Sequence, residues 1–252
     1  MRLFGLFKRL RRPPPPIPDP VWNATREGVP WLQRLDDARA GALAMLSARF
    51  LHEKTITPVG GLTLGEAERC RIAALCCLPL LEFGAEGLHG WSQVIVYPDA
   101  FRVNRSHVDA AGVLHEWQDE LIGEAWEQGP LILSWADLSA DCDDPRAGYC
   151  VAAHEMAHKL DALDGVLDGT PPLPRPWQRE WARDFQAAYD AFADAVDAGH
   201  DTAIDAYAAE SPEEFFAVAT EYHFSDPQLL RAKMPAVADH LRRLYGVSPF
   251  ET

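Results

Sequence analysis

One short segment constrains the fold more than any other, and it contains two histidines four residues apart. Residues 151–161 read VAAHEMAHKLD, with His154, then Glu155, then His158. In an α-helix, residues four apart differ by about 40° around the axis and about 6 Å along it, so both imidazoles can converge on one ion. Glu155 points away from that line and can reach a water beside the ion and accept its proton. Because the flanking residues are small or apolar, the segment predicts a buried helix with a metal site on one face.

Two histidines leave a zinc ion short of a third protein ligand, and the candidates lie downstream. Ser211-Pro212 predicts the start of a helix, with serine as the N-cap and proline in the first turn. Glu214 then falls at the third helical position, where it could equally act as a capping-box glutamate. The carboxylates that remain open as ligands are Glu210, Glu213, Glu214 and Glu221. The residue pattern alone does not choose among them.

Two further residues near these segments have competing interpretations. Asp161 lies three residues after His158 on the same helical face, so it can accept the second N–H of an imidazole and orient the ring. It can equally be an ordinary aspartate at the helix end, before Gly165, the expected left-handed cap. His223 offers another imidazole, but we interpret it as a histidine of the core or the surface rather than a ligand.

Apolar periodicity predicts the other elements of one α+β domain that is mostly helical. Residues 1–20 are basic and rich in proline, which predicts a flexible arm before a domain at 21–252. The predicted helices and strands are Trp31–Leu51, Thr63–Phe83 with a Thr63/Glu66 capping box, Arg179–Ala198, Val94–Tyr97 and Leu131–Trp135.

The charge distribution excludes one class of partner. The net charge is −15, and the first twelve residues hold five basic and no acidic residues, so the rest of the chain carries −20. Such a body repels phosphate, so we expect no binding to nucleic acid. Its acidic surface would instead attract cationic peptides or a basic protein.

Membrane insertion and secretion are also not expected. The longest apolar stretch, Ile72–Leu81, has about half the length that spans a bilayer. Leu3–Phe7 is too short for the apolar core of a signal peptide. The five cysteines are an odd number, which favours reduced thiols and a cytoplasmic location.

Several blocks of the sequence, in order, carry a resemblance to a known family. These are Ile95-Val96-Tyr97-Pro98 with Phe101; Gly123-Glu124-Ala125-Trp126 with Gly129-Pro130 and Leu133-Ser134-Trp135; His154 to Asp161 with Asp164-Gly165 and Asp168-Gly169-Pro171; and Glu214-Phe215-Phe216-Ala217-Val218 with Glu221-Tyr222. The chain resembles the Mlc titration factor A (MtfA) family of zinc-dependent peptidases, which in turn resemble the catalytic domain of anthrax lethal factor. Met156 stands where the family usually has phenylalanine, and Tyr149-Cys150 and His223 also depart from its pattern.

The resemblance implies a gluzincin-like zincin fold, with a small sheet beside the H-E-x-x-H helix and one zinc ion per chain. It implies that Glu214 is the third ligand and that Tyr207 stabilises the tetrahedral intermediate of peptide hydrolysis. The implied activity is aminopeptidase-type cleavage with Glu155 as the base, and Leu131–Trp135 is our expected edge strand for binding extended substrate.

The resemblance also implies a second, different function. The family takes its name from binding a transcriptional repressor of sugar-uptake genes and removing it from DNA. In that alternative, the chain is a non-catalytic interaction protein that sequesters the repressor.

Overall fold

Three parallel strands form the one sheet found in the described parts of the chain. The structure is a computed structural model, and it describes residues 14–99 and 129–251. The strand order is β1 (Thr55–Pro58), β2 (Gln93–Tyr97), β3 (Leu131–Ser134), with Val94 aligned to Leu131 in the register of the last two. Strands β2 and β3 bury alternate residues, among them Val94, Val96 and Leu133. The sheet therefore has a core-facing side of aliphatic residues.

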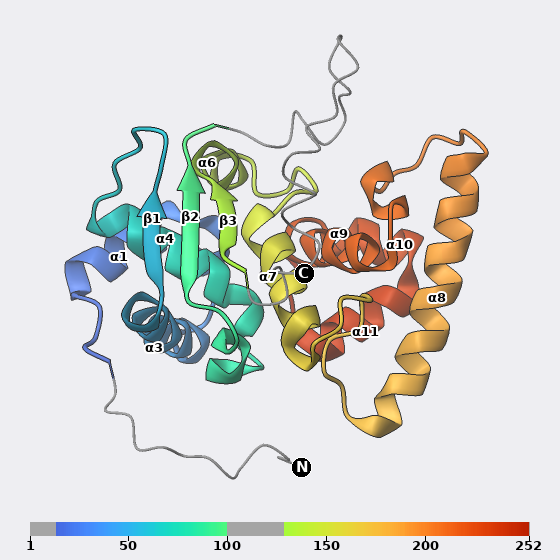
Figure 1. Ribbon diagram of the computed structural model, residues 1–252, viewed down its shortest axis with the longest axis horizontal. Coiled ribbons are helices and arrows are strands. Elements are labelled where there is room, and N and C mark those ends of the chain that lie inside the picture. The colour runs from blue at the N-terminus through green and yellow to red at the C-terminus, as the bar shows by residue number, and fades with distance from the viewer. Residues whose placement is uncertain (1–13, 100–128, 252) are drawn as a thin grey trace.

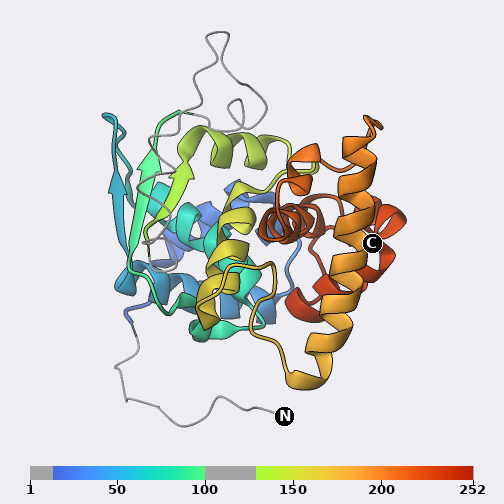
Figure 2. The ribbon, with the colours of Figure 1, turned by 45° about the vertical axis from the view of Figure 1, so that its right-hand side comes forward.

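The helices form two groups on either side of one central helix, α7 (Figures 1 and 2). The group beside the sheet comprises α1 (Asp19–Gly28), α2 (Pro30–Gln33), α3 (Asp37–Glu53), α4 (Glu66–Cys77) and α6 (Trp135–Asp143). The group on the opposite side comprises α8 (Arg175–Asp197), α9 (Pro212–Ser225), α10 (Pro227–Lys233) and α11 (Pro235–Tyr245). Four 3₁₀ turns complete these parts: η1 (Leu78–Leu80), η2 (Gly84–Leu88), η3 (Ala162–Asp164) and η4 (Ala206–Ala209).

Helix α7 (Val151–Asp161) contains the H-E-x-x-H segment and packs against β3, α4 and α9. Its small residues Ala152, Ala153 and Ala157 are all buried, which lets these neighbours approach closely. The fold is therefore the predicted one: a mostly helical α+β domain of zincin type with a small sheet beside the H-E-x-x-H helix. No helix in the described ranges is long and apolar enough to cross a membrane.

The helix predicted at Trp31–Leu51 is wrong as a single element, because the chain breaks it at residues 34–36. Helix α2 ends at Gln33, and Asp36 then accepts a hydrogen bond from the backbone N–H of Arg39 at 2.8 Å. An aspartate that caps the next helix competes with continuation of the previous one. The capping signal therefore outweighs the apolar periodicity.

The Thr63/Glu66 capping box is also wrong. Helix α4 begins at Glu66, and its N-cap is Gly65, which makes no side-chain capping bond. The helix ends at Cys77 rather than Phe83, and a 3₁₀ turn that contains Pro79 follows. Proline lacks the N–H that a continuing α-helix needs.

The two predicted strands are confirmed, each with one boundary shifted by one residue: β2 begins at Gln93 rather than Val94, and β3 ends at Ser134 rather than Trp135. Ser134 ends β3 by accepting a hydrogen bond from the N–H of Asp137 at 3.0 Å, so Trp135 starts α6 instead of extending the strand. Within the described ranges, β3 is an edge strand. The predicted helix at 179–198 corresponds to α8, and Gly165 has the expected left-handed conformation, with φ of 92°.

The predicted boundary at residue 20 falls inside a helix. Helix α1 begins at Asp19, inside the predicted 1–20 arm, and buries Thr25. Residues 1–13 lie outside the description, as do the resemblance blocks at Phe101 and 123–126. The division into an arm and a domain at 21–252 stays a prediction.

Candidate metal centre

Three side chains from two helices converge at the middle of the molecule. His154 and His158 come from α7, and Glu214 comes from the first turn of α9. Nε2 of His154 lies 3.2 Å from Nε2 of His158 and 3.2 Å from Oε2 of Glu214. Nε2 of His158 lies 3.5 Å from Oε1 of Glu214. The predicted histidine pair and one of the four downstream carboxylates are therefore together.

The spacing of these donor atoms suits a zinc ion. Bonds of about 2.0–2.1 Å in tetrahedral geometry place donor atoms about 3.3 Å apart, close to all three observed distances. Oε2 of Glu214 is buried and makes no hydrogen bond to any described residue, although Nε2 of His154 is near it. A buried carboxylate oxygen in that state is costly, and a cation removes the cost. Two imidazoles and one carboxylate are also a usual ligand set for catalytic zinc.

The charge of Glu214 is supported by its two neighbours. Burial raises the pKa of this carboxyl, but His154 and His158 outweigh burial and hold the pKa well below its usual range. The group is therefore a carboxylate at neutral pH, the form that binds a metal.

A second carboxylate of α9, Glu221, orients the first histidine. Oε1 of Glu221 lies 2.6 Å from Nδ1 of His154, and Oε2 accepts the backbone N–H of Cys150 at 2.9 Å. The pair is buried, so this contact leaves Nε2 of His154 facing the other donors. Sequence reasoning left Glu221 among the candidate ligands and missed its orienting role. Its spacing of seven residues from Glu214, on the same helical face, is the signal that could have identified it.

Asp161 does not orient an imidazole in this structure, contrary to one of its two predicted roles. Its two buried oxygens accept the backbone N–H groups of Gly169 at 2.7 Å and Thr170 at 2.8 Å. Burial raises the pKa of Asp161 to about 7. The carboxyl therefore holds the loop that follows α7.

That loop, which leads from α7 to α8, contacts both helices that carry the donor atoms. Gly169 has φ of 77°, and a Cβ atom built on it would lie 2.5 Å from the carbonyl oxygen of Pro212, at the start of α9. The carbonyl of Gly169 accepts a hydrogen bond from Nε1 of Trp181 at 3.1 Å. The loop is thus bound to α7 through Asp161 and pressed against the first turn of α9.

The start of α9 is the one predicted from Ser211-Pro212. Ser211 is the N-cap and accepts a hydrogen bond from the N–H of Glu214 at 3.3 Å, with Pro212 in the first turn. The side chain of Glu214 faces the histidines rather than completing a capping box. Glu210 and Glu213 are not in the cluster.

Tyr207 lies beside the histidines at the wall of a polar pocket. Its ring centroid is 6.3 Å from that of His154, and Asp205 accepts the N–H of Tyr207 at 3.0 Å. The pocket has a volume of about 830 Å³. Its titratable lining residues are Tyr149, Asp197, His200, Asp201, Asp205, Tyr207, Glu210 and Tyr222. Among the residues that the structure describes, no lysine or arginine lines the pocket, so this lining favours a positively charged group.

Two other predicted residues are placed as follows. Glu155 directly follows His154 and is half-buried. Burial lowers the pKa of Lys159, and the nearby charge of Glu155 raises that pKa by a smaller amount. His223 is a buried core histidine, as one of our interpretations had it, with its ring 4.9 Å from that of Phe224. Burial lowers the pKa of His223 to about 3.

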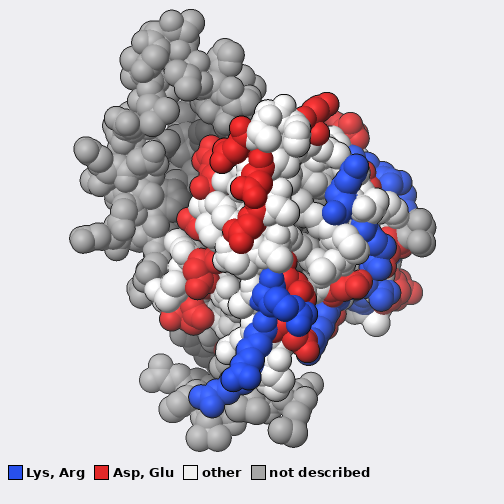
Figure 3. Space-filling model, turned by 90° about the vertical axis from the view of Figure 1, so that its right-hand side faces the viewer, with Lys and Arg blue, Asp and Glu red and all other residues white. Residues whose placement is uncertain are grey.

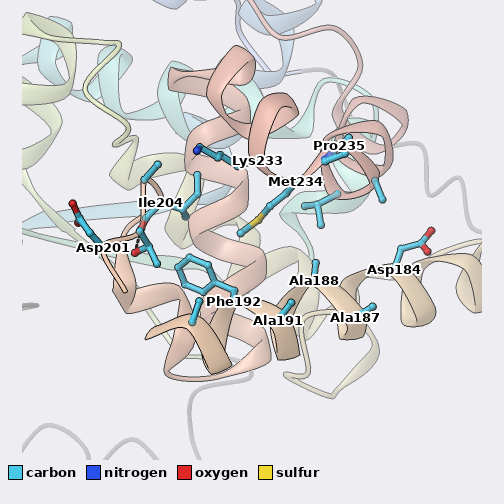
Figure 4. A pocket seen from close by; sticks show the side chains of 15 residues that line it. Asp184, Ala187, Ala188, Ala191, Phe192, Asp201, Ile204, Lys233, Met234 and Pro235 are labelled. Atoms are coloured by element: carbon cyan, nitrogen blue, oxygen red, sulfur yellow. Dashed lines mark hydrogen bonds between the residues drawn. The ribbon is translucent and has the colours of Figure 1, made fainter. Parts of the chain in front are cut away.

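A second cavity lies away from the donor atoms, between α8 and the junction of α10 and α11 (Figure 4). It has a volume of about 530 Å³, and its lining includes Phe192 and Met234 with a run of alanines from α8. Neither cavity is lined by the clustered donors, but Tyr207 in the lining of the first pocket has its ring centroid 6.3 Å from that of His154, so we associate that pocket with the cluster.

A mostly helical zincin-type fold with two histidines and a carboxylate around one point defines a metallopeptidase. Comparison with known families leads to the same class. The model of the family described as glucose-regulated metallo-peptidase M90 matches residues 7–246. The chain belongs to this family.

Curated relatives cover nearly the whole chain. Mlc titration factor A of Cronobacter sakazakii is 38% identical over 237 residues, which is 93% of this chain and 87% of that protein. The proteins of the same name from Klebsiella pneumoniae and Serratia proteamaculans are 37% and 38% identical, each over 88% of this chain and 84% and 85% of their own length. The resemblance in the sequence is therefore confirmed at the level of the family.

Proposed function

We propose that this chain is a zinc-dependent peptidase with one ion held by His154, His158 and Glu214. The observation that carries the proposal is the spacing of their donor atoms, 3.2–3.5 Å for the three pairs described above, together with the unbonded buried oxygen of Glu214. The family implies a metal ion, and zinc is the usual occupant of two imidazoles and a carboxylate.

In this proposal, each residue around the ion has a different role in the reaction. A bound zinc ion would supply Lewis acidity and make a nearby water easier to deprotonate. Glu155 accepts a proton from the water that attacks the peptide carbonyl, and then gives that proton to the leaving amine. Tyr207 donates a hydrogen bond to the oxygen that becomes negative during the attack.

Replacement of Glu155, the proposed base, tests these roles. Glu155→Gln should retain the metal and lose peptide hydrolysis by about 10²–10⁴-fold, because the amide cannot accept the proton. Tyr207→Phe should lower kcat and leave metal content unchanged. Hydrolysis at the unmutated rate in Glu155→Gln would rule out the proposed mechanism.

We further propose an aminopeptidase-type preference for free N-termini. The pocket beside Tyr207 is acidic and includes Asp205 and Glu210, which could bind a substrate amine. Glu213, which precedes Glu214, is a third candidate for this role, although it does not line the pocket. If Asp205→Asn, Glu210→Gln and Glu213→Gln each left the preference for free N-termini unchanged, this assignment would be wrong.

The position of β3 supports a way to bind extended substrate. The strand packs against α7 and is an edge strand within the described ranges. A peptide that adds to this edge would run past the metal centre, with its backbone hydrogen bonded to the strand.

A second function is favoured by the relatives, which are named Mlc titration factor A. The resemblance links that name to a transcriptional repressor of sugar-uptake genes, a basic DNA-binding protein. We propose that this chain binds such a repressor, with its acidic surface attracting the partner. Repressor capture by Glu155→Gln tests this function apart from hydrolysis, because the variant removes only the base. A cytoplasmic location would suit both functions and stays a prediction.

A further inference from the structure

Helix α8 presents one whole side to solvent at the edge of the molecule (Figures 1 and 2). Its inward side buries Trp177, Trp181, Phe185 and Phe192. The opposite side faces solvent, so packing within the chain does not restrict the order of its charged residues. The pattern it carries is therefore informative.

One stripe of the exposed side carries arginines on its first half and aspartates on its second half; Glu180, also exposed on the first half, pairs with Arg243 at 3.3 Å. The arginines are Arg175, Arg179 and Arg183, and the aspartates are Asp190, Asp194 and Asp197; all six are exposed. Their spacings of three and four residues place them on one stripe of the helix, the charged face of α8. Figure 3 looks onto this side of the molecule and shows acidic side chains in its upper part, with basic side chains gathered below them.

This order opposes the helix macrodipole. The N-terminus of a helix favours negative charge and the C-terminus favours positive charge. Helix α1 follows that rule, with Asp19 in the first turn and Arg26 in the last, whereas α8 has no acidic residue in its first turn and no basic residue in its last. The charged face therefore makes no favourable contribution to α8 as a single helix.

Few charged residues of this face form ion pairs or hydrogen bonds within the chain. Arg183 pairs with Asp184 at 2.7 Å, and Gln186 donates to Asp190 at 2.7 Å. The described part of the chain contains no ion pair to Arg175, Arg179, Asp194 or Asp197. The face thus has charges available for a partner.

The face is complementary to itself when two copies lie antiparallel. A two-fold axis between Gln186 and Ala187 sets Arg183 opposite Asp190 and Arg179 opposite Asp194. It sets Arg175 opposite Ala198, beside Asp197, and symmetry repeats each pair. Ala187, which borders this stripe and is labelled at the edge of the cavity in Figure 4, has a short side chain that lets a second helix approach.

We propose that the charged face of α8 binds the same face of a second copy of this chain, with the two helices antiparallel. A uniformly basic or acidic partner would be repelled by half of the face, whereas a second copy matches both halves. This interface does not depend on the proposed peptidase activity.

Sedimentation velocity of the full chain tests the interface. Exposed ion pairs are individually weak, so we expect a dimer at about 10–100 μM protein in about 50 mM salt, and dissociation in about 500 mM salt. Arg179→Asp should weaken the dimer about tenfold or more, because it places aspartate opposite aspartate twice. The double variant Arg179→Asp with Asp194→Arg should restore the dimer, because it exchanges the two charges.

Arg146→Asp is the matched control, since it makes the same charge change at an exposed residue outside α8 and should leave the dimer intact. Circular dichroism checks that each variant is folded. A monomer at about 100 μM in low salt would overturn the proposal. A dimer that tolerates Arg179→Asp, or one that the double variant does not restore, would overturn it equally.

Discussion

At the scale of single residues, the centre depends on two glutamates of one helix that face the same histidine from different sides. Glu214 lies beside Nε2 of His154, and Glu221 lies beside its Nδ1. They are separated by two helical turns, so the same face of α9 provides a donor atom and the group that orients another. A small change at Glu221 should therefore act on metal binding without removing a ligand.

Glu221→Gln tests this orienting contact. The amide keeps the size of the side chain but loses the negative charge, and it can accept only one of the two N–H groups now bound. We expect the affinity for zinc to fall by about 10–100-fold, measured by competition with a chelator of known affinity. Glu213→Gln is the control on the same helix, and equal affinity in the two variants would contradict the role of Glu221.

The sequence could predict His154, Glu155 and His158 because their spacing on a helix is itself the chemical signal. It could not choose among Glu210, Glu213, Glu214 and Glu221, because the choice depends on how α9 packs against α7. The resemblance pointed to Glu214, and the structure brings that residue to the histidines. Asp161 has the same helical face as His158, yet its oxygens are used by a loop whose path the sequence pattern does not specify.

At the scale of elements, the loop after α7 sets the separation of the two helices that hold the donor atoms. A Cβ atom at Gly169 would clash with the carbonyl of Pro212, whereas a Cβ atom at Gly165 would meet open space; both glycines have positive φ. Comparison of the two positions therefore separates backbone strain from contact with α9.

Gly169→Ala should cost more stability than Gly165→Ala and should also weaken metal binding. Both variants place alanine in the left-handed region, at a cost of about 1–2 kcal/mol. Only Gly169→Ala adds a contact with α9, which we expect to cost about 1–3 kcal/mol more and to displace Glu214. Thermal unfolding and zinc affinity measure the two effects. The idea fails if the variants lose equal stability and bind zinc equally.

The pKa of Asp161 gives this loop a dependence on pH. The folded pKa of about 7 is above the ordinary 3.8, so the folded protein favours the protonated form. That stabilising contribution is complete below pH 3.8 and is lost as the pH rises through about 7. Asp161→Asn lacks the titration, so the melting temperature of the unmutated chain should fall relative to the variant between those values. Both proteins are compared with a chelator present, and a constant difference across that range would contradict the assignment.

Strong local signals made several elements predictable, and the failures have particular causes. Ser211-Pro212 and Gly165 fix a start and an end through backbone chemistry, and both are confirmed. The break at Asp36 comes from a competing cap, whereas α4 starts at Glu66 after Gly65, which makes no side-chain capping bond; periodicity alone predicts neither boundary. Strand β1 is only four residues long and ends in proline, so its place in the sheet comes from pairing with β2.

At the scale of the whole molecule, the acidic body should attract cationic substrates. Residues 13–252 carry −20, of which only Glu155, Glu214 and Glu221 are tied to the centre. The remaining acidic residues produce a long-range negative electrostatic potential. Salt screens this potential, with a Debye length of about 10 Å at 0.1 M.

Salt should therefore slow the hydrolysis of cationic peptides more than that of neutral ones. We expect kcat/KM for a lysine-rich peptide to fall several-fold between about 20 and 200 mM salt, and that for a neutral peptide of equal length to change little. An equal response of the two peptides would show that the acidic surface does not steer substrate.

The account depends most on the metal centre, and the most direct test is the metal content of the purified chain. Elemental analysis should find one zinc per chain in the unmutated protein and in Glu155→Gln. It should find almost none in His154→Ala or Glu214→Ala, with Glu210→Ala as a control that keeps the metal. An unmutated chain without stoichiometric metal, or full zinc content in Glu214→Ala, would contradict the centre proposed here.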